Sequence, residues 1–161
     1  MQIVFDSRAL QMYPLANPVG FRGGTEMMVM RLAEGLAERG HSVNVVANDC
    51  QRMELRSDRL FIWPPDTFPR HVECAVLVHN LTPLASYLKA DVVIAATNGI
   101  DPDLAGMAKH VDAWPVFSAK HAELLAKKNP DVDAAKCHVV GLGVDLEPFG
   151  SLTARKAAKV P

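Results

Sequence analysis

The hydrophobic residues of this chain fall into two kinds of pattern, short and nearly continuous runs and one-sided helical repeats. The runs, which are typical of strands buried on both faces, occupy residues 3–5, 43–46, 74–78 and 91–96. Between the first two runs, apolar residues recur at three- and four-residue spacing from Met28 to Leu36, and Gly40 follows as a helix-ending residue. This strand–loop–helix–strand order predicts a βαβ unit, which forms on a parallel sheet.

The alternation of strands and helices continues along the chain. We expect further strands at 60–63, 114–117 and 138–140, and helices at 83–89, 101–109 and 119–128. Ser118 is the expected N-cap of the last helix, because a serine hydroxyl accepts a hydrogen bond from the backbone of the first turn. The sequence therefore predicts an α/β fold, a Rossmann-like, doubly wound, mainly parallel sheet with helices on both faces. We expect residues 1–150 to form this domain and residues 151–161 to be a tail or the start of an interdomain linker.

Composition narrows the class of protein. The 161 residues include 17 Lys and Arg against 18 Asp and Glu. The chain therefore lacks the basic excess of most nucleic-acid-binding proteins, and we expect no nucleic-acid partner. Its cysteines, Cys50, Cys74 and Cys137, form no CxxC pair, which favours a reducing compartment over a disulfide framework. Asp6 comes too early for a signal peptide, and no apolar run approaches the roughly 20 residues that span a bilayer, so we expect a cytoplasmic protein.

Two adjacent glycines, Gly23 and Gly24, stand directly before the first long helix. Glycine lets the backbone approach a ligand closely, and the N–H groups at a helix start bind phosphate. The same pattern also fits an ordinary glycine-containing loop, and the local sequence leaves both interpretations open. Neither GxGxxG nor GK[ST] occurs here, which disfavours a dinucleotide fold and a P-loop. We expect Glu26, in the first turn, to interact with the helix dipole.

Three motifs give the chain a resemblance to a known family. GGxE occurs at Gly23–Glu26, RGHxV at Arg39–Val43, and VVGLGVDLEPF at Val139–Phe149. In this order they resemble the first domain of GT-B fold glycosyltransferases of family 4, which are retaining enzymes that use nucleotide sugars. The third motif departs from the family pattern at Leu142, where an asparagine is usual, and this weakens any polar role for that loop.

The resemblance implies a glycosyltransferase of hexosyltransferase type, whose nucleotide-sugar donor and unknown acceptor bind between two domains. It implies that the backbone N–H groups of Gly23, Gly24 and Thr25 face the donor diphosphate, where leaving-group charge develops. It also implies a C-terminal, donor-binding GT-B domain beyond Pro161, so we expect the chain alone to be inactive. The nucleotide sugar is a substrate, and we expect neither a cofactor nor a metal.

Polar residues that follow the predicted strands are the remaining candidates. His79 follows the strand at 74–78 and is the candidate catalytic residue. The competing interpretation is a histidine whose hydrogen bonds are satisfied by backbone at the strand end. Asn80, Asn98 and Ser118 also follow strand ends, and we place them on the acceptor or sugar side.

Two alternatives remain open at this stage. A stand-alone Rossmann-like module that binds a phosphorylated ligand without catalysis would share the fold and the glycine loop. A basic helix face carries Lys120, Lys127 and Lys128. Such a face is typical of a solvated surface, and the alternative interpretation is peripheral contact with a membrane.

Overall fold

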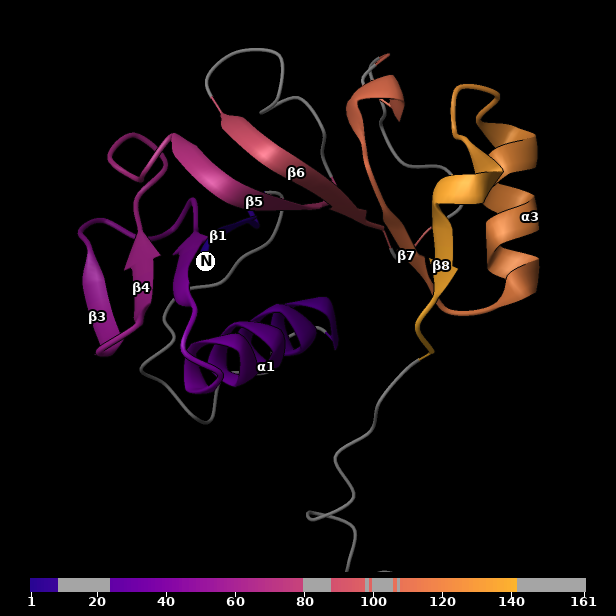
Figure 1. Cartoon of the computed structure of the whole chain (residues 1–161). Coiled ribbons are helices and arrows are strands. Elements are labelled where there is room, and N and C mark those ends of the chain that lie inside the picture. Colours follow the sequence, from indigo (N-terminus) through magenta and orange to yellow (C-terminus); the bar gives the residue numbers. More distant parts are fainter. Residues whose placement is uncertain (9–23, 80–87, 98, 100–105, 107, 142–161) are drawn as a thin grey trace, which may run out of the picture.

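The computed structural model describes residues 1–8, 24–79, 88–97, 99, 106 and 108–141. The strands are β1 (Gln2–Asp6), β2 (Ser42–Val46), β3 (Glu54–Ser57), β4 (Leu60–Trp63), β5 (His71–Val78), β6 (Lys89–Ala96), β7 (Trp114–Val116) and β8 (Cys137–Val139). The helices are α1 (Gly24–Glu38) and α3 (Ala119–Lys128), with 3-10 turns at Ala108–His110 and Ala134–Lys136. Figure 1 shows how these elements are arranged.

Six strands form one sheet in the order β3-β4-β2-β1-β5-β6, in which only the β3–β4 pair is antiparallel. β1 lies inside the sheet, where Ile3 stands opposite Val43 of β2 on one side and Cys74 of β5 on the other. The strand order reverses at β1, which makes it the topological switch point where open α/β sheets bind ligands. The predicted mainly parallel, doubly wound sheet is confirmed.

A separate parallel pair, β7 and β8, lies at the end of the molecule away from β3 (Figure 1). One parallel bridge between Ile94 and Ala113 joins this pair to β6, and the Ala95 N–H donates to the Ala113 carbonyl at 3.0 Å. The strands therefore form one layer with a seam between β6 and β7, where a single bridge replaces a ladder.

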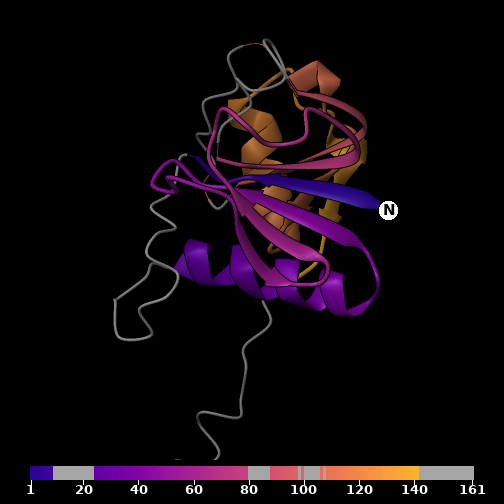
Figure 2. The same cartoon turned by 90° about the vertical axis from the view of Figure 1, so that its left-hand side faces the viewer.

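Alternate residues of the strands face two hydrophobic cores, one on each side of the sheet. On one side, α1 packs through Val29 and Ala33 in a cluster that includes Phe5 of β1. On the other side, Leu125 of α3 packs in a cluster that includes Val4 and Trp114. Figures 1 and 2 show α1 along one face of the sheet and α3 beside β7 and β8. The prediction of helices on both faces is confirmed.

Both of the longer predicted helices have the expected ends. Gly40, which follows α1, has a φ of 90°, a left-handed conformation that favours a residue without a Cβ. Its N–H donates to the Ala37 carbonyl at 2.9 Å, which closes the last turn. At the start of α3, the Ser118 hydroxyl oxygen accepts a hydrogen bond from the His121 N–H at 3.1 Å. The predicted N-cap is therefore confirmed.

Two local expectations are wrong or incomplete, and one strand was not predicted. Lys89, expected at the end of a helix, is the first residue of β6, where its N–H donates to the Arg70 carbonyl at 2.8 Å. Of the helix expected at 101–109, the described part is a 3-10 turn at Ala108–His110. β3 was not expected, because its sequence ELRS has no run of apolar residues. Residues 83–87 and 101–105 lie outside the described residues.

Candidate functional site

The parallel strands end together at one edge of the sheet, which we call the carboxyl edge. Seven strands, β1, β2, β4, β5, β6, β7 and β8, end here at Asp6, Val46, Trp63, Val78, Ala96, Val116 and Val139. Both helices begin toward this edge, because α1 leads from β1 back to the start of the parallel strand β2 and α3 directly follows β7. Parallel α/β sheets bind their ligands at such an edge, so the candidate site is built from the residues that follow these strands.

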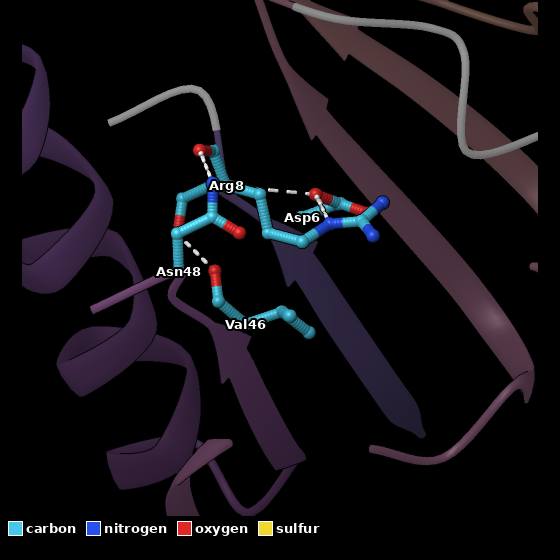
Figure 3. A network of polar contacts seen from close by, with 5 residues as sticks. Asp6, Arg8, Val46 and Asn48 are labelled. Carbon is cyan, nitrogen blue, oxygen red and sulfur yellow. Dashed lines mark hydrogen bonds and ion pairs between the residues drawn. The ribbon is translucent and has the colours of Figure 1, made fainter. Parts of the chain in front are cut away.

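A buried ion pair stands at the end of the central strand. Asp6 is 3% exposed, and its two carboxylate oxygens accept hydrogen bonds from Arg8, from Nε at 2.9 Å and from Nη2 at 2.6 Å. The guanidinium carbon of Arg8 also lies 6.0 Å from the ring centroid of Phe68. Figure 3 shows the Arg8 side chain lying alongside Asp6. This two-point contact holds the Arg8 side chain in place directly after β1.

Two further hydrogen bonds attach the same segment to the end of β2 and to the residues that follow it. The Ser7 hydroxyl donates to the Val46 carbonyl at 2.7 Å, and the Asn48 side-chain amide donates to the Arg8 carbonyl at 2.7 Å (Figure 3). Ser7 is fully buried. This network was not predicted from the sequence, although the polar residues that directly follow a buried strand were a signal for it.

The first turn of α1 contains two of the residues predicted to face a phosphate, Gly24 and Thr25, together with Glu26. A Cβ added at Gly24 would meet no atom within 4 Å, so the space around this position is open. Val29 of α1 and Val78 at the end of β5 belong to the same core cluster. The Val78 side chain therefore faces the side of the sheet that α1 covers. Gly23 lies outside the described residues.

His79, the predicted catalytic residue, adopts an unusual backbone conformation. Its φ is 63°, in the left-handed region that costs a non-glycine residue about 1–3 kcal/mol. The His79 N–H donates to the Ala96 carbonyl at 3.2 Å, so its backbone is paired with the neighbouring strand. Within the described part of the chain, no hydrogen bond reaches its imidazole. Among the described residues, backbone thus satisfies the amide of His79 but not its side chain.

The ends of β6 and β7 carry a second polar cluster, formed by Thr97, Gly99, Phe117, Ser118 and His121. Ser118 is exposed and uses its hydroxyl oxygen to cap α3, while no described residue accepts its hydroxyl proton. Thr97 is 4% exposed and accepts a hydrogen bond from the Gly99 N–H at 3.2 Å. The other two acceptor-side predictions, Asn80 and Asn98, lie outside the described residues.

A hollow of about 720 Å³ lies beside α1 against the β3–β4 hairpin, but none of the predicted site residues lines it. Its charged residues include Arg31 and Glu34, which pair with each other at 3.2 Å. Among the described residues, no group of three or more His, Cys, Asp or Glu side chains could hold a metal ion. No helix in that same part of the chain is long and apolar enough to cross a membrane.

The cysteines are free thiols, as the absence of paired spacing suggested. Cys50 and Cys74 are buried and Cys137 is partly buried. Burial is the main cause that raises the pKa of each thiol above its ordinary value. A raised pKa keeps a thiol protonated at neutral pH, so these cysteines are poor nucleophiles and metal ligands.

The fold is that of a Rossmann-like domain, and its central strand, first helix and switch point meet at the edge where folds of this class bind ligands. A family model narrows the class of protein. The model of Glycosyltransferase Family 4 matches residues 22–116, which is more than half of the sequence, and the chain belongs to that family. This confirms the resemblance found in the glycine and RGHxV motifs. The chain is therefore a glycosyltransferase-family domain.

Two solved structures share the fold, both of sucrose-phosphate synthase from Thermosynechococcus elongatus. The first is 15% identical, with a TM-score of 0.63, over 100% of this chain and 53% of that one. The second is 13% identical, with a TM-score of 0.54, over 99% of this chain and 98% of that one. At these identities the likeness concerns the fold alone. This chain spans about half the length of the first structure. No protein with a curated description matches the sequence significantly.

Proposed function

We propose that this chain is the N-terminal, acceptor-side domain of an enzyme that moves a sugar from a nucleotide-sugar donor to an acceptor. Membership of Glycosyltransferase Family 4 supports the class of reaction. The observation that carries the proposal for this site is the conformation of His79, which directly follows β5, the strand that pairs with β1 at the switch point. This residue is held in a left-handed conformation, and no described residue hydrogen-bonds its imidazole. Strained residues of this kind gather at functional sites.

The proposed place for the donor diphosphate is the start of α1. Backbone N–H groups at a helix N-terminus have no partner within the helix and carry partial positive charge. Gly24 and Thr25 are the first two residues of α1, and the open space at Gly24 supports the close approach of a phosphate. Charge develops on the diphosphate as it leaves, so these groups would stabilise the transition state. A contact between the Gly23 N–H and the same diphosphate stays a prediction.

The proposed place for the acceptor hydroxyl is beside His79. As the acceptor oxygen bonds to the sugar carbon it loses its proton, and the diphosphate leaves with the electron pair of the broken carbon–oxygen bond. In this proposal the neutral imidazole of His79 accepts that proton. Ser118 supports the acceptor side, because its hydroxyl proton is left to donate to a sugar oxygen. Asn80 and Asn98 remain predictions for this side.

A second domain, which holds most of the nucleotide sugar, is proposed to follow residue 150. The likeness to a synthase structure of which this chain spans 53% supports a longer enzyme. Because most donor contacts would then come from the second domain, the chain alone is proposed not to transfer sugar. The nucleotide sugar enters as a substrate, and the proposal includes no metal or cofactor.

Binding of pyrophosphate to the 161-residue chain, followed by backbone amide shifts, tests the donor side. Gly24→Pro removes one N–H at a helix position where proline is tolerated. We expect it to weaken pyrophosphate binding about tenfold, since a hydrogen bond to a charged group is lost. Gly24→Ala keeps the N–H and is the matched control. Equal affinity in wild type and Gly24→Pro would place the phosphate elsewhere.

Sugar transfer tests the reaction. The chain and any longer protein encoded by an open frame beyond Pro161 are incubated with UDP-, GDP- and ADP-sugars, and release of nucleoside diphosphate is measured. We expect release only from the longer protein. Turnover by the chain alone would overturn the proposed inactivity. A stop codon directly after Pro161, with pyrophosphate binding retained, would instead favour a binding module without catalysis.

A further inference from the structure

The imidazole of His121 lies between two backbone segments at the carboxyl edge. Its Nδ1 is 3.3 Å from the Phe117 backbone nitrogen, and its Nε2 is 3.2 Å from the Gly99 carbonyl oxygen. The Phe117 ring lies against the imidazole, with ring centroids 5.4 Å apart. One side chain of α3 thus contacts the end of β7 and the segment after β6.

These two contacts fix where the imidazole carries its proton. The Phe117 N–H is a donor, so Nδ1 must present its lone pair to it. The Gly99 carbonyl is an acceptor, so Nε2 must carry the proton and donate it. Both bonds exist together only in the neutral tautomer that is protonated on Nε2. The opposite tautomer would break both bonds.

The position of His121 matters because of the seam between β6 and β7. One bridge, Ile94 to Ala113, joins these strands, and within the described residues no backbone hydrogen bond links them beyond Ala95. Closer to the carboxyl edge, where no ladder joins the two strands, the His121 imidazole links the residues that follow β6 to those that follow β7. Thr97 supports the same segment, because its hydroxyl oxygen accepts from the Gly99 N–H.

We propose that His121, as the Nε2–H tautomer, is a positioning residue that holds the segments after β6 and β7 at a fixed separation. These segments include Ser118, whose hydroxyl caps the same turn, and Gly99, the sequence neighbour of Asn98. His121 thereby shapes the half of the edge assigned to the acceptor. That assignment rests on the proposed function, whereas the tautomer and the connection do not.

The tautomer is tested on the wild-type chain by long-range proton–nitrogen NMR of the histidine rings. We expect the His121 ring to show an unprotonated Nδ1 and a protonated Nε2 at neutral pH. A ring protonated on Nδ1, or one averaging between tautomers, would overturn the proposal. This measurement needs no variant, so it stands even where a substitution fails to fold.

The connection is tested by amide hydrogen exchange at Phe117 in matched variants. His121→Phe keeps a ring but removes both hydrogen bonds, and we expect about tenfold faster exchange, because the local segment opens more often. His121→Asn places an acceptor oxygen near the Nδ1 position and is expected to restore protection. His71→Phe, at an exposed residue at the start of β5, is the control.

Unchanged Phe117 exchange in His121→Phe, or no recovery in His121→Asn, would remove the positioning role. Pyrophosphate binding at the start of α1 is measured in the same variants. It is expected to stay at the wild-type level, since His121 and α1 belong to different ends of the edge. Loss of pyrophosphate binding in wild type would count against the proposed function, and the tautomer and exchange results would still decide the role of His121.

Discussion

Arg8 holds both carboxylate oxygens of Asp6, through Nε at 2.9 Å and Nη2 at 2.6 Å, at the end of the central strand. The two residues are separated by one position, so the contact forms directly at the point where β1 ends. Bidentate pairs of this kind are stronger and more directional than single charged contacts. The pair therefore fixes residues 6–8 at the end of β1.

Replacing Arg8 by alanine is expected to lower the free energy of unfolding by about 3 kcal/mol, because a buried carboxylate loses its partner. We choose the low end of the usual range because the Arg8 side chain is itself 20% exposed. The control is Arg31→Ala, which removes an exposed pair with Glu34 and is expected to cost less than about 0.5 kcal/mol. Urea denaturation measures both. Equal effects of the two substitutions would mean that the Asp6–Arg8 contact stabilises the fold no more than a surface pair does.

His79→Gly is expected to be more stable than His79→Ala by about 1 kcal/mol, since glycine adopts a positive φ without a steric penalty. Both variants remove the imidazole, so both are expected to lower sugar transfer by a longer, active enzyme about 100-fold or more. Thermal unfolding and turnover are the measurements. Stability that rises while turnover falls would show that the strained residue is kept for its side chain. Full turnover in His79→Gly would exclude a catalytic role.

Glu26→Gln is expected to tighten pyrophosphate binding to the chain about two- to fivefold, because a negative charge in the first turn of α1 opposes an anion at the helix start. Glu38→Gln is the matched control at the other end of the helix. It lies roughly 18 Å away along the axis, beyond the screening length of about 10 Å in 0.1 M salt. Calorimetric titration of the two variants separates local from general charge effects. Equal gains in both variants would indicate nonspecific anion binding.

The thiols are expected to resist a disulfide reagent at neutral pH in the folded chain, with Cys50 and Cys74 slower than Cys137. Burial raises the pKa of all three above the ordinary 9.0, so folding favours the protonated form. The free energy of unfolding should therefore fall as pH rises through about 9, where the thiols of the unfolded chain ionise first. Urea denaturation between pH 7 and 10 measures this loss. Fast reaction of Cys74 in the native chain would contradict its burial.

Local patterns were sufficient to predict most elements. The three- and four-residue spacing of apolar residues predicted α1, and the serine before Ala119 predicted the cap and limits of α3. β3 was not predicted, because Glu54–Ser57 has no run of apolar residues and becomes a strand only through pairing with β4. Lys89 was misassigned for the same reason, since its pairing with the segment of Arg70 and His71 is a long-range contact.

The sequence by itself determined the fold class, the family motifs and the position of His79 after a buried strand. Only the tertiary structure decided that His79 has a positive φ and that Arg8 pairs with Asp6. It also decided that the His121 side chain contacts both Phe117 and Gly99. The reason is physical: hydrophobic periodicity and helix caps depend on neighbours within a few residues. Side-chain partners at the carboxyl edge depend on the order in which distant strands assemble, which no local pattern contains.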